Sequence, residues 1–272
     1  MVLYWILLPI IWVLVHLIWH VEVEGRENLR AVRDGRAFVI CPNHVANLDP
    51  VFIAITVFDW RRLVILAKEE LFANPLAGWF LRCMGAVSIQ RGKGDTVTID
   101  HITDACKRGR GVMIFPEGTR TKNGQLGPLK SGAFVIATAA GADILPCRII
   151  YNTKDGRMRP FCAMRICFGP AIPAVELRIE DPKHKVSALR KMKGRLKTEL
   201  DGLLVAHAFE GTALPAPEEK PARPARKPVP APEETPAALP EETPALTLEA
   251  DAPASPVLDA AAEPAPEPKE AL

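Results

Sequence analysis

The chain has 272 residues, of which 48% are apolar and 24% are charged, and its formal net charge is +2. A chain of this size can bury a core of up to about 200 residues, which excludes a short peptide or a disulfide-framed miniprotein. The net charge hides an asymmetry, because residues 1–210 hold 29 basic and 20 acidic residues, net +9, whereas residues 211–272 hold 5 and 12, net −7. The two parts therefore need separate interpretations.

The first 21 residues form an apolar segment that has no acidic or basic residue apart from two histidines. A helix of this length spans roughly 30 Å, which is enough for the core of a bilayer. A secretory signal is not expected, because no basic residue precedes the segment and no small-residue cleavage site follows it. Four arginines come directly afterwards, at Arg26, Arg30, Arg33 and Arg36. By the positive-inside rule we predict a membrane-associated helix over residues 1–21, with the rest of the chain on the cytoplasmic side of the cell inner membrane.

The spacing of aromatic residues in this segment leaves its position in the membrane open. Tryptophans recur every seven residues, at Trp5, Trp12 and Trp19, and two histidines, His16 and His20, fall near the same helical face. Such a stripe suits a helix that lies in the membrane interface as well as one that spans the bilayer. A helix buried in the core of the protein is the third interpretation.

Residues 22–210 alternate short β-rich apolar runs with longer helical patterns. Strands are expected over residues 37–41, 63–67, 86–90, 111–115 and 144–151. Helices are expected near residues 51–58, 76–84, 96–108, 132–140 and 186–205. This alternation predicts a single layered α/β domain with a mixed, partly parallel sheet flanked by helices.

The C-terminal stretch, residues 211–272, has a different composition. It contains 15 prolines and 16 alanines and no aromatic residue. Such a sequence cannot bury enough apolar surface to offset the loss of chain entropy on folding. We expect a disordered Pro/Ala/Glu-rich tail, either inert or used to bind a partner, and a folded domain that ends near residue 210.

Polar residues cluster after three of the expected strands. The clusters consist of Asn43, His44 and Asp49 after the first strand, Arg91 after the third, and Glu117, Gly118, Thr119 and Arg120 after the fourth. Open α/β sheets build their sites at the carboxyl ends of strands. If these strands are parallel and adjacent, the three clusters converge on a single cleft.

His44 and Asp49 are the candidate catalytic pair. Five residues on an ideal helix leave two side chains about 140° apart, so the two can meet only if His44 precedes a helix and Asp49 lies in its first turn. Pro42 and Pro50 favour that arrangement. A carboxylate that accepts from one imidazole nitrogen would leave the other nitrogen as a base for a hydroxyl group. The spacing alone is a weak signal, and a structural role for both residues is the competing interpretation.

Four blocks in this order resemble the glycerolipid acyltransferase family, and within it the 1-acylglycerol-3-phosphate acyltransferases. Residues 43–49 match the family pattern N-H-x-S-x-x-D, and residues 115–120 match F-P-E-G-T-R without a gap. Residues 85–91 and 144–146 are similar to its other two blocks, and the resemblance covers roughly residues 23–151. One departure is Ala46, which replaces the usual serine and bears on acceptor preference or local hydrogen bonding more than on activity.

The resemblance implies an activity and a role for each motif residue. A fatty acyl group would pass from acyl-CoA or acyl carrier protein to the sn-2 hydroxyl of lysophosphatidic acid, giving phosphatidic acid in phospholipid biosynthesis. His44 would be the general base and Asp49 would orient it. The substrate-binding residues would be Arg91, Glu117, Gly118, Thr119 and Arg120, with the two arginines on the phosphate of the acceptor. Residues 22–210 would then be the acyltransferase domain.

No cofactor, metal or nucleic-acid partner is expected. The six cysteines include no C-x-x-C pair and are expected to be reduced thiols, and the histidines lack metal-ligand spacing to them. Three alternatives stay open: the same chemistry on a lysophospholipid or a lyso-ornithine lipid, a metal-dependent hydrolase that uses His44 and Asp49, and a non-enzymatic membrane-anchored scaffold. We expect the lipid bilayer, lysophosphatidic acid and the acyl donor to be the partners of the protein.

Overall fold

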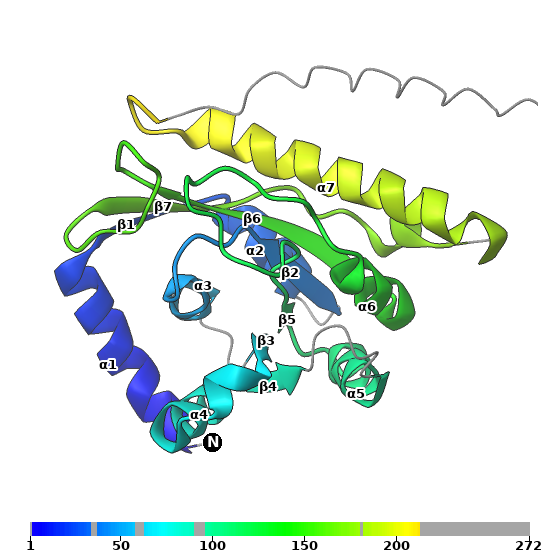
Figure 1. Ribbon diagram of the computed structural model, residues 1–272, viewed down its shortest axis with the longest axis horizontal. Helices are drawn as coiled ribbons and strands as arrows, with labels where there is room; N and C mark the ends of the chain where they lie inside the picture. The colour runs from blue at the N-terminus through cyan, green and yellow to red at the C-terminus, as the bar shows by residue number, and fades with distance from the viewer. Residues whose placement is uncertain (1, 34–36, 58–62, 90–95, 180–181, 213–272) are drawn as a thin grey trace, which may run out of the picture. The chain divides into compact units, whose positions relative to one another are not determined.

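A computed structural model of the chain describes residues 2–33, 37–57, 63–89, 96–179 and 182–212 (Figure 1). All of these residues belong to one compact unit, Met1–Glu218. The predicted tail, residues 211–272, lies outside the described residues except for its first two positions.

The described residues form a seven-stranded sheet with the strand order β1-β7-β6-β2-β5-β3-β4. The strands are β1 (His20–Glu24), β2 (Phe38–Pro42), β3 (Val64–Lys68), β4 (Ala86–Ile89), β5 (Val112–Met113), β6 (Asp143–Tyr151) and β7 (Ala163–Phe168). The five strands from β6 to β4 are parallel to one another, β7 is antiparallel to β6, and β1 is parallel to β7. The predicted mixed, partly parallel sheet is therefore confirmed.

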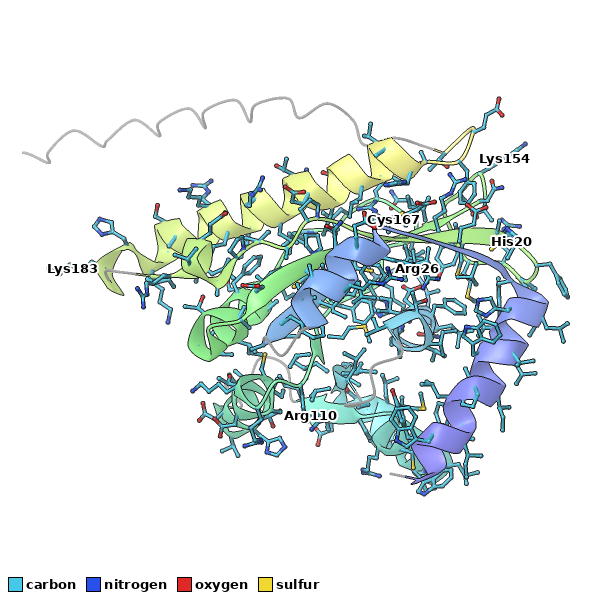
Figure 2. The ribbon with its side chains drawn as sticks, turned by 180° about the vertical axis from the view of Figure 1, so that it is seen from behind. His20, Arg26, Arg110, Lys154, Cys167 and Lys183 are labelled. Atoms are coloured by element: carbon cyan, nitrogen blue, oxygen red, sulfur yellow. The ribbon has the colours of Figure 1, made fainter. Side chains whose placement is uncertain are left out.

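Helices cover both faces of this sheet. They are α1 (Val2–Ile18), α2 (Arg26–Arg33), α3 (Asp49–Val57), α4 (Pro75–Cys83), α5 (Thr96–Lys107), α6 (Gly132–Ala140) and α7 (Lys185–His207), with short 3₁₀ helices η1 (Glu69–Phe72), η2 (Ala174–Leu177) and η3 (Pro182–His184). In Figure 1, α7 lies on the opposite side of the sheet from α1 and α3. Seen from behind in Figure 2, Arg26 marks the start of α2, which packs against β6 and β7.

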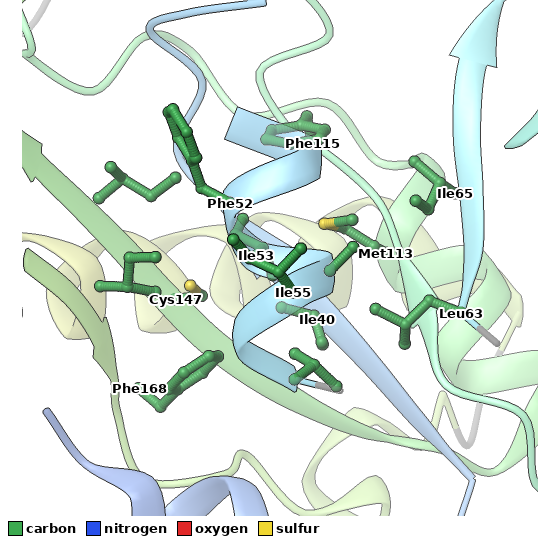
Figure 3. Packing of buried hydrophobic residues seen from close by; sticks show 14 of the residues in the cluster. Ile40, Phe52, Ile53, Ile55, Leu63, Ile65, Met113, Phe115, Cys147 and Phe168 are labelled. Carbon is green, nitrogen blue, oxygen red and sulfur yellow. The ribbon is translucent and has the colours of Figure 1, made fainter. Parts of the chain in front are cut away.

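Two separate apolar cores explain why β2 is apolar at every position. Phe38 and Ile40 pack with α1 and α3 on one face, whereas Val39 and Cys41 pack with α5, α6 and α7 on the other. Strands buried on both faces have continuous apolar runs because both sets of alternating side chains leave water. Figure 3 shows the first core, in which Phe52 of α3 and Phe168 of β7 lie near Ile40. Truncating a fully buried phenylalanine such as Phe52 costs about 3–5 kcal/mol of stability.

The N-terminal segment differs from the predicted single helix over residues 1–21. The helix α1 ends at Ile18, and residues 20–24 form the strand β1. The alternation of apolar and charged residues in His20–Glu24 has the period of a strand, and its pairing with β7 overrides the helical pattern before it. Among the described residues, no helix combines the length and the apolar character needed to cross a membrane.

The helix α1 buries one side and exposes the other. Its buried side chains, Tyr4, Leu8 and Val15, join the core that contains α3. Its exposed large apolar side chains are Ile6, Ile10, Trp12, Val13, Leu14 and Leu17. The tryptophans of the stripe therefore diverge, since Trp12 is exposed while Trp19 packs edge-on against Phe52 and donates a hydrogen bond to the carbonyl of Arg159.

Candidate active site

His44 and Asp49 lie where β2 gives way to α3. His44 is in the connection that follows β2, and Asp49 is the first residue of α3, as the spacing argument requires. The imidazole Nδ1 of His44 lies 2.9 Å from Oδ2 of Asp49. The Asp49 side chain is fully buried and that of His44 is 18% exposed. The pair is therefore anchored inside the protein and open to solvent on the imidazole side.

The carboxylate of Asp49 is held by four donors. Its Oδ2 atom accepts from the backbone N–H groups of Val45 at 2.6 Å and Ala46 at 2.8 Å, in addition to His44, and its Oδ1 atom accepts from the hydroxyl of Tyr151. Because Nδ1 of His44 donates to this carboxylate, Nε2 of the neutral ring is the acceptor. Ala46 contributes its backbone N–H, so the missing serine hydroxyl leaves this contact intact.

The backbone of His44 is fixed on both sides by the loop that follows β5. Its N–H donates to Oε1 of Glu117 at 2.8 Å, and its carbonyl accepts from the N–H of Thr121 at 2.8 Å and from the Thr121 hydroxyl at 3.2 Å. The ring of Phe115 lies against the imidazole, with the two ring centroids 4.1 Å apart. These contacts leave His44 little freedom to shift along or across the strand end.

Glu117 is directed at backbone groups. Its side chain is buried, and its second oxygen accepts from the N–H of Gly127 at 2.7 Å. Burial raises the pKa of Glu117 above its ordinary value, while the two N–H donors and the charges of Arg148 and His44 act in the opposite direction. The structure thus places Glu117 behind His44, and among the described residues it is not part of the wall of the cavity beside that histidine.

A cavity of about 340 Å³ opens beside His44. Its polar lining among the described residues consists of His44, Asn47, Lys68, Gly118, Thr119 and Arg120. Its apolar lining comes mainly from α3, β3, η1, α4 and β4, through Val51, Ala54, Ile65, Leu66, Ala67, Leu71, Phe80, Leu81, Met84 and Ala86. A site of this kind accommodates a ligand with one polar end and one long apolar end.

The structure brings two of the three predicted clusters together. His44 shares the cavity with three residues of the loop after β5, namely Gly118, Thr119 and Arg120. Gly118 has a φ of +70°, a left-handed conformation that favours glycine, and a Cβ there would lie 2.9 Å from Nζ of Lys130. The third cluster is represented by Arg91, which lies outside the described residues, although the parallel strand β4 ends just before it.

Three residues with structural roles at the site were not assigned one from the sequence. Tyr151 and Thr121 hold Asp49 and His44, as described above. Asn43 connects β2 to β6, since its side chain donates to the carbonyl of Ile149 at 3.2 Å and accepts from the Ile149 N–H at 2.7 Å. The only sequence signals were the position of Tyr151 at the end of an apolar run and the presence of Asn43 in the first motif.

Within the described ranges, no group of three or more His, Cys, Asp and Glu side chains is placed to hold a metal ion.

The stretch that holds this site is similar to known proteins. Residues 20–150 match the family model described as Acyltransferase. This match bears out the resemblance that the motifs indicated, over a stretch that holds the His44–Asp49 pair and the loop from Phe115 to Arg120.

Several curated relatives carry related names. The chain is 30% identical over 135 residues to a chloroplastic 1-acyl-sn-glycerol-3-phosphate acyltransferase of Brassica napus, which covers 49% of this chain and 38% of the relative. It is 34% identical over 147 residues to a lyso-ornithine lipid O-acyltransferase of Pseudomonas aeruginosa, a match that covers 53% of this chain and 54% of the relative. It is 27% identical over 184 residues to a 1-acyl-sn-glycerol-3-phosphate acyltransferase of Bacillus subtilis, a match that covers 68% of this chain and 89% of the relative.

The extent of these matches differs among the relatives. The chain spans 38% of the Brassica napus relative and 54% of the Pseudomonas aeruginosa one. Among solved structures it is similar to the 1-acyl-sn-glycerophosphate acyltransferase PlsC of Thermotoga maritima, with a TM-score of 0.47, 22% identity, and coverage of 66% of this chain and 72% of that one.

Proposed function

We propose that this protein transfers a fatty acyl group from a thioester donor, acyl-CoA or acyl carrier protein, to the sn-2 hydroxyl of lysophosphatidic acid, giving phosphatidic acid. The observation that carries the proposal is the position of the His44–Asp49 pair. Its imidazole lies in the wall of a cavity whose other walls are largely apolar. No cofactor beyond the donor substrate is needed for this chemistry.

The two residues of the pair divide the proton chemistry. Nε2 of His44 takes the proton of the acceptor hydroxyl as its oxygen attacks the carbonyl carbon of the thioester. A C–O bond forms, the C–S bond breaks, and the departing thiolate receives the proton from the imidazolium. Asp49 keeps Nδ1 protonated and stabilises the positive ring between these two transfers. The transfer is direct and leaves no acyl group on the enzyme.

The two kinds of cavity lining suit the two ends of the substrates. The apolar walls from α3, β3, α4 and β4 can hold an acyl chain out of water. Thr119 and Arg120 are exposed on the polar side, and a guanidinium can bind a phosphate through two parallel hydrogen bonds. Arg91, in the segment after β4, is proposed as the second phosphate ligand on the strength of the family motif alone.

We also propose that the protein works on the cytoplasmic face of the cell inner membrane. The exposed apolar side of α1 supports this, because contiguous apolar surface on a helix that also carries Trp12 suits the interface of a bilayer. Vesicle flotation tests it: Leu14→Glu should release the protein from vesicles, whereas Ala139→Glu on the exposed side of α6 should not. Equal flotation of the two variants would contradict a role for α1.

A second acceptor deserves a direct test, because one relative is named lyso-ornithine lipid O-acyltransferase. That acceptor lacks the phosphate of lysophosphatidic acid. If Arg120 binds phosphate, Arg120→Ala should reduce turnover of lysophosphatidic acid and spare turnover of lyso-ornithine lipid. Mass spectrometry of products from a mixture of both acceptors, with acyl-CoA and acyl carrier protein as competing donors, would identify the preferred pair.

The decisive experiment is His44→Ala in the purified full-length protein. Loss of a general base costs about 10²- to 10⁴-fold in rate. Acyl transfer should therefore fall below about 1% of the wild-type rate, with unchanged far-UV circular dichroism and vesicle binding. Retention of more than that fraction would reject His44 as the base.

A further inference from the structure

We propose that Arg148 is a positioning residue for His44, and that it acts through Glu117 and the loop between them. The inference builds on the proposed acyl transfer but concerns a residue outside the four family blocks. Arg148 is not among the described residues that line the cavity, so any effect on chemistry must be transmitted.

Arg148 is a fully buried cation in the middle of the sheet. It belongs to β6, which is paired with β2 on one side and β7 on the other. Its neighbours Cys147 and Ile149 face the core that contains α3, so Arg148 faces the opposite side, toward α7. Burying a charge of this kind carries a desolvation cost that opposite charges and hydrogen bonds have to compensate.

The compensation comes from two elements that are far apart in the sequence. Nη2 of Arg148 donates to the carbonyl of Gly124 at 2.8 Å, in the loop after β5. Nη1 lies 3.8 Å from Oδ1 of Asp201 on α7. Burial lowers the pKa of Arg148, and the charges of Asp201 and Glu117 act against this shift. Among the described residues, Nε and Nη1 have no hydrogen-bond partner, so the two carboxylates provide much of the compensation.

Glu117 carries the opposite buried charge, and it is the link to the site. Its carboxylate accepts from the N–H groups of His44 and Gly127, and the positive charge of Arg148 opposes the effect of burial on its pKa. The hydrogen bond between Glu117 and Gly127 closes the loop between these two residues, and the hydrogen bond from Arg148 holds the loop at Gly124. A Cβ on Gly124 would lie 3.1 Å from Gly156, so the loop is also closely packed there.

The position of His44 follows from this loop. Glu117 and Thr121, which bind the N–H and the carbonyl of His44, are both part of it. Removing the charge of Arg148 frees the loop at Gly124 and leaves Glu117 buried beside one fewer positive charge. Among the described residues, the charges of His44 after β2, Asp201 on α7 and Cys167 on β7 also act on this pair, and Lys197 forms an ion pair with Asp201.

The test is the pH dependence of kcat/KM in Arg148→Met and Arg148→Lys. Without the neighbouring charge, Glu117 is protonated at higher pH and loses acceptor capacity for the His44 N–H. In Arg148→Met the acidic limb of the profile should move up by about one pH unit, and the plateau should fall about 10- to 100-fold. Arg148→Lys keeps the positive charge and should leave the acidic limb close to its wild-type pH. Arg195→Met removes an ion pair with Glu199 on α7, and it should change neither the pH of the acidic limb nor the plateau value of kcat/KM.

A double variant separates positioning from general damage. If Arg148 acts through the charge of Glu117, Glu117→Gln should abolish the shift of the limb caused by Arg148→Met. A shift that persists in the double variant, or a uniform loss at every pH, would overturn the proposal. If Arg148→Met does not fold, Asp201→Asn serves instead: loss of that negative charge should move the limb slightly to lower pH, and a move to higher pH would contradict the model of coupled charges.

Stability provides a readout that is independent of catalysis. The folded-state pKa of Glu117 is raised, so its contribution to stability is present at low pH and is lost as the pH rises above 4.5. That loss should extend to higher pH in Arg148→Met and vanish with Glu117→Gln. If the wild type acylated no lyso-lipid, the proposed function would fail, while these unfolding curves would still decide whether Arg148 and Glu117 are coupled.

Discussion

The hydroxyl of Tyr151 donates a hydrogen bond of 2.5 Å to Oδ1 of Asp49, on the side of the carboxylate opposite His44. Tyr151 is the last residue of β6 and is buried, so the partner of the imidazole is itself held by the sheet. Burial and the charge of Asp49 raise the pKa of Tyr151 well above its ordinary value, so the phenol keeps its proton and remains a donor at neutral pH.

Replacing Tyr151 with phenylalanine should separate orientation from proton chemistry. The change leaves one buried oxygen of Asp49 without its donor, which costs about 1–3 kcal/mol of unfolding free energy. Acyl transfer should fall less than about tenfold, because the contact between His44 and Asp49 remains. Asp49→Asn should in contrast reduce kcat by about 10⁴-fold, as expected when the base is held in the wrong tautomer. Urea unfolding and steady-state kinetics check both, and equal losses of activity would contradict this division.

Two glycines with left-handed backbone make a matched test of the loop after β5. Gly118 has a φ of +70° and Gly141 has a φ of +60°, and a Cβ on Gly141 would meet nothing within 4 Å. Alanine at either position should cost about 1–2 kcal/mol of stability. Only Gly118→Ala should also raise the KM for the acceptor, since Gly118 lines the cavity. A similar KM for the two variants would show that close approach at Gly118 is not needed.

The apolar wall of the cavity should control the length of the transferred chain. Ala54 is buried on α3 and lines the cavity, so Ala54→Phe fills part of the space beside His44. We expect the products to shift toward shorter acyl groups when a mixture of donors is supplied. Ala77→Phe on the exposed side of α4 is the control. Mass spectrometry of the lipids measures the distribution, and an unchanged distribution would place the acyl chain elsewhere.

The cysteines should divide into two classes by reactivity. Burial raises the pKa of Cys106 to about 11 and that of Cys167 to about 12, and Cys41 and Cys147 are also fully buried. Because only the thiolate reacts, a thiol with a pKa near 11 is about 0.1% reactive at pH 8. Iodoacetamide at pH 8 should label the partly exposed Cys83 and Cys162 first in the native protein. Peptide mass spectrometry should find all six labelled after denaturation in urea, and rapid native labelling of Cys106 would contradict its burial.

The central strands and the helices between them could be predicted because their signals are local. The run at residues 37–41 predicted β2, whose apolar residues serve two cores. The two prolines around the first motif favoured a helix with Asp49 in its first turn, although the helix was expected near residues 51–58 and α3 begins at Asp49. The strand β1 could not be found in the same way. Its partner β7 lies about 140 residues further along the chain, and its five residues follow an apolar helix without any turn signal.

The same contrast holds for the site. The residues of the motifs were identified by type and order, and the convergence of His44 with Gly118, Thr119 and Arg120 followed from the parallel strands β2 and β5. The direction of the Glu117 side chain was not predictable, because a carboxylate in a loop gives no indication that two backbone N–H groups will surround it. The role of Arg148 could not be predicted for another reason. One arginine in an apolar strand does not indicate which carboxylates will lie near it, because Glu117 and Asp201 approach it only in the folded chain.

The pairing of β1 with β7 joins the N-terminal helix directly to the sheet. α1 runs into a strand of the sheet after a single residue, and Trp19 at that junction is bound to the carbonyl of Arg159 in the β6–β7 hairpin. His20 and Lys154 mark these two segments on the same side of Figure 2. If a surface binds the apolar side of α1, this direct connection therefore sets the orientation of the cavity relative to that surface. Lengthening the junction at Trp19 would remove that control without altering a single residue of the site.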